Sequence, residues 1–275
     1  MRLALLLSGT GDKEDMTLGQ WITDHLKDQD SWLSIPLPTF EPIHIFGIPV
    51  DFSITSHLVM MWIASLILIL VMRANFGKQR MEPKGIGALL ESLALFIRDE
   101  IAIPNMGEKN GRKLTPFLCT LFFFILTLNM MGLIPLFTTA TGNISITAGL
   151  AVITFALTQA YGIKENGLIG YCKSLVPGGI PVLLLPIMIP IEILGLFTKP
   201  FALAIRLFAN MTAGHTVIYA LLGLIIILGT LFVSPVSVAF ALFINFLEIL
   251  IAFIQAYIFT MLSALFMGMA MHPDH

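Results

Sequence analysis

The sequence predicts an all-α integral membrane protein with five transmembrane helices and one amphipathic surface helix, in which the last two transmembrane helices form a long, tilted hairpin. Two observations support this fold class. Hydrophobic residues make up 57% of the 275-residue chain and charged residues only 12%, whereas a soluble domain carries about 25% charged residues. The apolar residues are also gathered into five long runs, and a helix of about 20 such residues crosses the hydrocarbon core of a bilayer.

The five apolar runs cover residues 56–72, 114–136, 146–161, 180–233 and 236–271. The first three have about the length of one membrane-crossing helix. The last two are too long for a helix that stands upright in a ~30 Å core at 1.5 Å per residue. We therefore expect two long, tilted helices that meet near Ser234 and Pro235 and form a hairpin over about 180–271.

Two regions outside these runs complete the predicted organisation. Residues 1–55 form an acidic head, which contains eight Asp and Glu residues but only three Lys and Arg residues. Residues from about 83 to 103 place apolar side chains at helical spacing with charges on the other face, which is typical of a helix lying on the membrane surface. The chain thus divides into an outer head, 1–55, and a membrane domain, 56–275.

The basic residues predict the orientation of the membrane domain. Eight lie between the first and second spans, and Lys164 and Lys173 follow the third, whereas the loop 137–145 carries no charge. Because loops rich in Lys and Arg stay on the inner side, the N-terminus is expected outside and the C-terminus inside. The eight residues are Arg73, Lys78, Arg80, Lys84, Arg98, Lys109, Arg112 and Lys113.

Composition also excludes several classes of function. The net charge is −2 and no basic patch is visible, so we expect no nucleic-acid partner. Cys119 and Cys172 are isolated, and offer neither a disulfide framework nor the spacing of a metal site. We expect no cofactor and no bound metal.

A polar stripe runs along the fourth apolar segment. Glu192, Lys199, Arg206 and Asn210 follow one another at spacings of seven, seven and four, which places them on one face of a helix. His215 lies nine residues after Arg206, about half a turn round the helix, and is expected nearer the outer end. A polar stripe on a membrane helix must face a cavity or another protein.

The last apolar segment carries a second stripe. Asn245, Glu248 and Gln255 recur at spacings of three and seven, again on one face. If the two long helices pair antiparallel, His215 comes close to Glu248. A histidine and a carboxylate at membrane depth are typical of a proton relay.

Each polar residue also has a structural interpretation. His215 suits a hydrogen-bonded structural histidine, and Glu248 a protonated carboxyl that joins helices. The ammonium of Lys199 can extend to the inner interface, and Glu192 can lie on a solvated face near the inner end. Asn210 and Gln255 can bridge helices.

Arg206 is the exception, because its guanidinium stays charged. A permanent charge at membrane depth costs at least about 2.5–3.5 kcal/mol on insertion scales. The chain must therefore place Arg206 against protein, water or a partner's carboxylate, which makes this stretch a candidate functional site.

The run from Lys199 to His215, KPFALAIRLFANMTAGH, resembles the motif of subunit a of F-type ATP synthases. The segment from Glu248 to Phe259 is similar to the last helix of that family, and a looser likeness extends over the whole chain. The order His215 then Glu248 resembles mitochondrial members, while the long acidic head resembles bacterial ones. Gly132 departs from relatives that carry an acid at this position.

The resemblance implies a proton-translocating stator subunit of a rotary ATP synthase in a bacterial inner membrane, or alternatively a mitochondrial one. Arg206 would face the ring of c subunits and separate two offset aqueous half-channels, and peripheral-stalk b subunits would be further partners. The remaining candidate residues for proton translocation are His215, Glu248, Gln255, Asn210, Glu192, Asn245 and Lys199. Such a subunit makes no bonds itself and is no enzyme on its own.

Two other classes of protein fit the membrane fold. A secondary transporter would use Arg206 to hold an anionic substrate, but would be built from inverted repeats with broken helices in both halves, which the sequence does not contain. A purely structural membrane scaffold would leave Arg206 without a partner, and the cost of burying its charge argues against that.

Overall fold

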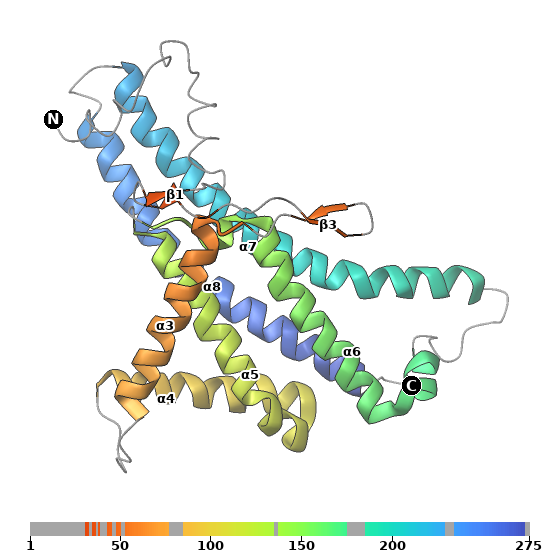
Figure 1. Ribbon diagram of the computed structural model, residues 1–275. Helices are drawn as coiled ribbons and strands as arrows, with labels where there is room; N and C mark the ends of the chain where they lie inside the picture. Colours follow the sequence, from red (N-terminus) through yellow and green to blue (C-terminus); the bar gives the residue numbers. More distant parts are fainter. Residues whose placement is uncertain are drawn as a thin grey trace.

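The computed structural model describes residues 31–32, 35–36, 38, 43–45, 48–50, 53–76, 85–134, 137–174, 185–228 and 234–272. It is built almost entirely from helices (Figure 1). The prediction of an acidic outer head over 1–55 falls largely outside these residues. Within the described part of the head, β1 (Ser31–Trp32) pairs with β2 (Ile35–Pro36), and β3 (Ile43–Ile45) pairs with β4 (Ile48–Val50), both antiparallel. These short strands were not predicted.

Five helical stretches of the described chain are long and apolar enough to cross a membrane, which confirms the predicted fold class. They contain α3 (Ser56–Phe76), α5 (Ile103–Gly132), α6 (Ile144–Ser174), α7 (Leu185–Leu228) and α8 (Ser234–Met271). Two shorter elements precede α5, namely α4 (Ile86–Phe96) and the π-helix η1 (Ile97–Ala102). The 3₁₀ turn η2 (Ala140–Gly142) joins α5 to α6.

The observed bounds differ from the predicted ones mainly at breaks in helices. The second span ends at Gly132 rather than at 136. The helix α6 continues beyond the predicted end at 161 and is broken at Gly167, with a φ of 71°, before a last short piece that reaches Ser174. The predicted surface helix over about 83–103 is present from Ile86 onward, but it runs directly into the next helix. The break between them, at Gly107, falls in the interval between the two predicted elements.

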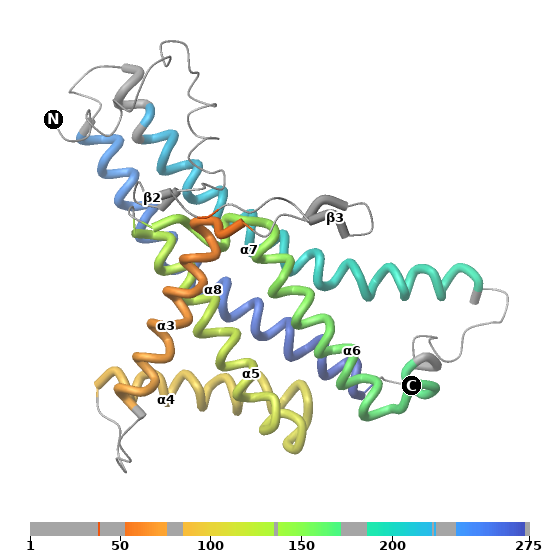
Figure 2. The backbone as a smooth tube through the Cα atoms, viewed as in Figure 1, coloured from red at the N-terminus to blue at the C-terminus, as the bar shows by residue number. Residues whose placement is uncertain are grey.

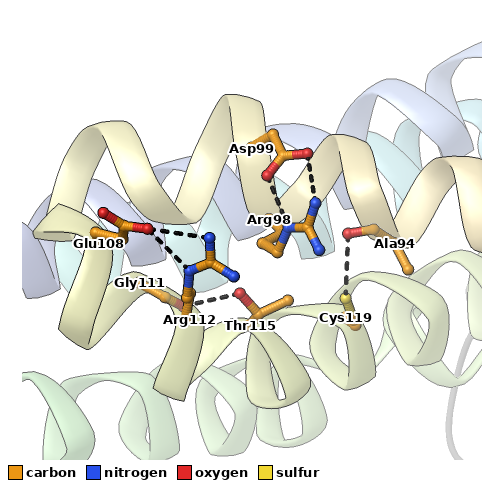
Figure 3. Close-up of polar contacts among 8 residues, drawn as sticks. All are labelled: Ala94, Arg98, Asp99, Glu108, Gly111, Arg112, Thr115 and Cys119. Atoms are coloured by element: carbon orange, nitrogen blue, oxygen red, sulfur yellow. Dashed lines mark hydrogen bonds and ion pairs between the residues drawn. The ribbon is translucent and has the colours of Figure 1, made fainter.

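The break between the surface segment and the second span is at Gly107. Its φ of 75° lies in the left-handed region, which glycine adopts without steric cost. The chain reverses there and packs back on itself. Ala102 lies against Gly111, and the Ala94 carbonyl oxygen lies 4.0 Å from Cys119 Sγ, so α4 and η1 run antiparallel to the start of the span (Figure 3).

Charged residues of this helical reversal pair with near neighbours and stay exposed. Arg98 contacts Asp99 at 2.7 Å, and Arg112 contacts Glu108 at 3.0 Å (Figure 3). One end of α5 and one end of α6 meet nearby, because the ammonium groups of Lys113 on α5 and Lys164 on α6 each lie 5.7 Å from the centre of the ring of Tyr161.

The core lies where α8 packs against α5, α7 and α6. Its fully buried side chains come from different helices and include Leu118, Leu207, Phe259 and Met267. A second, smaller cluster lets α3 pack on α5 and η2 through Met60 and Leu128. Large apolar side chains are also exposed on the outer faces of α3, α7 and α8, as a surface that contacts lipid requires.

The last two helices form the predicted long hairpin. At 1.5 Å per residue, the 44 residues of α7 span about 66 Å and the 38 residues of α8 about 57 Å. The tube in Figure 2 shows the light-blue end of α7 beside the blue start of α8, and both extend away from the other helices. Both helices therefore exceed the thickness of a ~30 Å hydrocarbon core.

The packing of α8 on the surface segment depends on Gly268. A Cβ atom at this position would overlap the carbonyl oxygen of Asn105, a backbone atom that cannot move aside alone. We expect Gly268→Ala to destabilise the subunit by about 1–3 kcal/mol, as overpacking does. Gly149→Ala is the matched control, because a Cβ there meets nothing within 4 Å and Ala favours a helix. Thermal unfolding of the purified assembly measures both, and equal stability of the two variants would contradict this packing.

Candidate functional site

The site is built around His215, a buried residue of α7 with 9% of its surface exposed. Its Nδ1 lies 3.0 Å from the Met211 carbonyl oxygen, one turn earlier on the same helix. Its Nε2 lies 2.9 Å from the Gly132 carbonyl oxygen at the end of α5, and 2.9 Å from the hydroxyl of Thr139 before η2. Three segments of the chain thus hold one imidazole ring.

The fourth neighbour of His215 is Glu248 on α8. The distance from His215 Nδ1 to Glu248 Oε1 is 3.6 Å, and the glutamate is 5% exposed. The close approach depends on Gly214, since a Cβ there would overlap the carboxyl group of Glu248. The antiparallel pairing of the two long helices therefore brings His215 and Glu248 together, as the spacing predicted.

The carboxyl group of Glu248 has unusual surroundings. Neither of its oxygens has a hydrogen-bond partner among the residues that the structure describes. A buried carboxylate without partners is costly, and the cost falls when the group takes up a proton or is hydrated. The arrangement is therefore suited to proton uptake, with one imidazole as the adjacent base or acid.

Deeper along the same pair of helices, Asn210 and Gln255 are joined directly. The Asn210 side-chain amide donates to Gln255 Oε1 at 2.8 Å. Gln255 is 2% exposed, and its own Nε2 has no partner in the described part of the chain. This contact bridges α7 and α8 about one turn beyond Arg206.

Arg206 lies on the outer face of α7. Its side chain is exposed, and it forms no hydrogen bond or ion pair with any residue that the structure describes. Leu203, three residues before it, and Leu207, one residue after it, are buried. The exposed residues beside Arg206 include Ala202, Ala209 and Asn210, so small side chains surround the guanidinium.

The other predicted residues are not brought into one cluster. Lys199 is half-buried, with its ammonium 5.7 Å from the centre of the Phe266 ring. Glu192 and Asn245 are half-buried as well, and neither forms a hydrogen bond or ion pair within the described residues. Lys199 lies seven residues before Arg206, and Glu192 lies seven residues before Lys199, so both are on the side of Arg206 away from His215.

Sequence reasoning missed the polar residues supplied by α5 and η2. Thr139 reaches His215, and Thr141 donates to Asn129 Oδ1 at 2.8 Å, while the Asn129 amide donates to the Ala252 carbonyl at 3.4 Å. The loop 137–145 was noted only for its lack of charge. Two of its three threonines, Thr139 and Thr141, make these contacts, and the clustering of threonines in an uncharged loop was the signal that could have identified it.

Comparisons with known proteins agree with this geometry. Residues 58–268 match the ATP synthase A chain family. The chain is similar to an ATP synthase subunit a of Myxococcus xanthus, with 48% identity over 89% of this chain and 92% of the relative. It is also similar to one of Chloroherpeton thalassium, with 53% identity over 86% of this chain and 74% of the relative. A protein of Chlorobaculum tepidum, ATP synthase subunit a 2, is 44% identical over 97% of this chain and 77% of its own length.

This degree of identity over most of the chain decides against the transporter and scaffold alternatives. The chain belongs to the ATP synthase A chain family, and its function is that of subunit a, the proton-translocating stator subunit of the membrane sector, which is not catalytic on its own.

Proposed function

We propose that this subunit provides two offset aqueous half-channels that load and unload the carboxylates of a ring of c subunits, and that Arg206 separates them. The observation that carries the proposal is the exposed guanidinium, which has no partner within the described chain and needs one at membrane depth. An ionised carboxylate on a neighbouring subunit supplies such a partner.

The outer half-channel passes His215 and Glu248. Protons enter from outside and reach the glutamate, whose oxygens are buried and unpartnered by described residues. Asn245 and Gln255 line the way inward on the same helix. The final acceptor is a carboxylate on a c subunit, which becomes neutral and can then turn into lipid.

The inner half-channel lies on the other side of Arg206, near Glu192. The carboxyl group returns there after nearly a full revolution of the ring and loses its proton to the inside. Lys199, between Glu192 and Arg206, adds a second positive charge on this side. The driving force is about 2.3 kcal/mol per charge for each 100 mV of membrane potential.

Arg206 acts by its charge. A fixed cation favours the ionised form of the approaching carboxylate, which promotes proton release. It also raises the energy of a proton that moves directly from one half-channel to the other, because like charges repel. The contact between Asn210 and Gln255 braces the two helices beside it.

The exposed face around Arg206 is the proposed contact with the c-ring. Ala202, Ala209 and Ala213 are exposed on the same side of α7, and small residues allow a neighbouring helix to approach closely. The peripheral-stalk b subunits are the second proposed partners, and they hold this subunit still while the ring turns.

The proposed location is a bacterial inner membrane, with the N-terminus outside and the C-terminus inside. The convergence of Lys113 and Lys164 on Tyr161 supports this orientation, because it gathers basic residues of two connections at one end of the bundle. His215 and Glu248 then lie toward the uncharged loop 137–145, on the outer side.

Arg206→Ala tests the proposal directly. We expect coupled ATP synthesis in energised membrane vesicles to be lost, with passive proton leak, because nothing then separates the half-channels. Arg112→Ala is the matched control, since Arg112 is exposed and paired only with Glu108, a surface pair worth about 0–1 kcal/mol. Synthesis that continues unchanged in Arg206→Ala would refute the proposal.

Glu248→Gln tests the outer path. The amide keeps the size of the side chain but carries no transferable proton, so proton flux should fall by roughly 10²-fold, as on losing a general acid–base group. The amount of assembled complex should stay the same. Glu108→Gln, at an exposed glutamate outside the site, should leave flux unaltered. Normal proton flux in Glu248→Gln would show that the pair of Glu248 with His215 is only a structural contact.

A further inference from the structure

Both ring nitrogens of His215 lie against hydrogen-bond acceptors. Each ring nitrogen lies against a backbone carbonyl oxygen, Nδ1 at 3.0 Å from Met211 and Nε2 at 2.9 Å from Gly132. Carbonyl oxygens only accept hydrogen bonds. A doubly protonated ring satisfies both contacts, whereas a neutral ring carries a single N–H and leaves one lone pair facing an acceptor.

One neighbour of the ring can act either way. The hydroxyl of Thr139 lies 2.9 Å from His215 Nε2 and 3.5 Å from the Gly132 carbonyl oxygen. A hydroxyl group has one rotating hydrogen and two lone pairs, so it can donate or accept. The other polar neighbours of the ring among the described residues are the Glu248 carboxyl, 3.6 Å from Nδ1, and Tyr219, which meets the ring edge-on.

We propose that Thr139 is a positioning residue whose hydroxyl supports both protonation states of His215 in a single ring orientation. When both nitrogens are protonated, Nε2 donates to the hydroxyl oxygen or to Gly132, and the hydroxyl hydrogen points to the Gly132 carbonyl. When Nε2 has lost its proton, the hydroxyl turns and donates to it, while Nδ1 still donates to Met211. The hydroxyl hydrogen moves and the ring stays in place.

This role rests on the proposed proton path through His215. It assigns the proton that the ring loses to Nε2, because Thr139 can donate to Nε2, whereas loss from Nδ1 would leave that lone pair against the Met211 carbonyl oxygen. The titratable side chains found against the ring are Glu248 of α8, and Tyr219 of α7 with its ring centre 6.2 Å away. The segments from α5 and η2 contribute only neutral groups there.

The pH dependence of proton flux tests the role of the hydroxyl. Thr139→Val keeps the shape and removes the donor to the neutral ring, while Gly132 still accepts from the protonated one. His215 should then keep its proton to higher pH, and the pH profile of flux through the reconstituted complex should move upward by about half to one unit, the effect of one hydrogen bond. Thr139→Ser should restore the original profile.

Thr127→Val is the matched control, because the hydroxyl of Thr127 contacts only Phe123 of its own helix; its profile should not move. If Thr139→Val does not assemble, Thr139→Cys replaces it with the same expected shift, since a thiol is a weak donor. A profile that stays in place in the assembled variant, or that Thr139→Ser fails to restore, would overturn the proposal.

Nitrogen NMR of the labelled, membrane-embedded complex separates this inference from the proton path. With His215→Gln used to assign the signals, the neutral ring should show an N–H at Nδ1 and a hydrogen-bonded, unprotonated Nε2. Thr139→Val should weaken the hydrogen bond at Nε2. An N–H at Nε2 in the neutral ring would contradict the proposed role of Thr139, even if Glu248→Gln blocks proton flux. Unaltered flux in Glu248→Gln would instead refute the proposed proton path, and the NMR result on Thr139 would still stand.

Discussion

The arrangement of this subunit depends on one positive charge that cannot be removed. The guanidinium of Arg206 stays protonated at any pH the membrane experiences, and the described chain provides no anion for it. A cation exposed among apolar helices is stable only if something else meets it. The small residues beside Arg206 and the apolar faces of α7 and α8 suit another helix that brings a carboxylate and takes it away again.

The same constraint explains why the titratable pair lies on the other side of α7. His215 is half a turn from Arg206, and it is buried against α5, η2 and α8 rather than exposed. The imidazole is thereby kept away from the fixed cation and close to Glu248. Close approach of the two long helices at Gly214 makes this contact possible, so helix packing and proton chemistry depend on the same residues.

Much of the fold and of the site could be predicted from the sequence, because hydropathy and helical spacing are patterns that extend over many residues. The five spans, the long hairpin and the meeting of His215 with Glu248 follow from those two patterns. Thr139 and Thr141 were missed because they come from a turn whose geometry no periodicity encodes, and Asn129 because nothing in the spacing of α5 links it to that turn. The break at Gly107 falls between the predicted surface helix and the predicted second span, but the pattern did not show that this single glycine reverses the chain.

Cross-linking tests most directly whether the Arg206 face meets a moving ring. With Cys119 and Cys172 replaced by Ser, a cysteine is introduced at Ala209, exposed beside Arg206, or at Leu203, buried in the core of the helix bundle. Paired with a cysteine next to the c-subunit carboxylate, Ala209→Cys should form a disulfide and stop proton flux until it is reduced, while Leu203→Cys should form none. Efficient cross-linking from Leu203, or none from Ala209 in an assembled complex, would contradict the account.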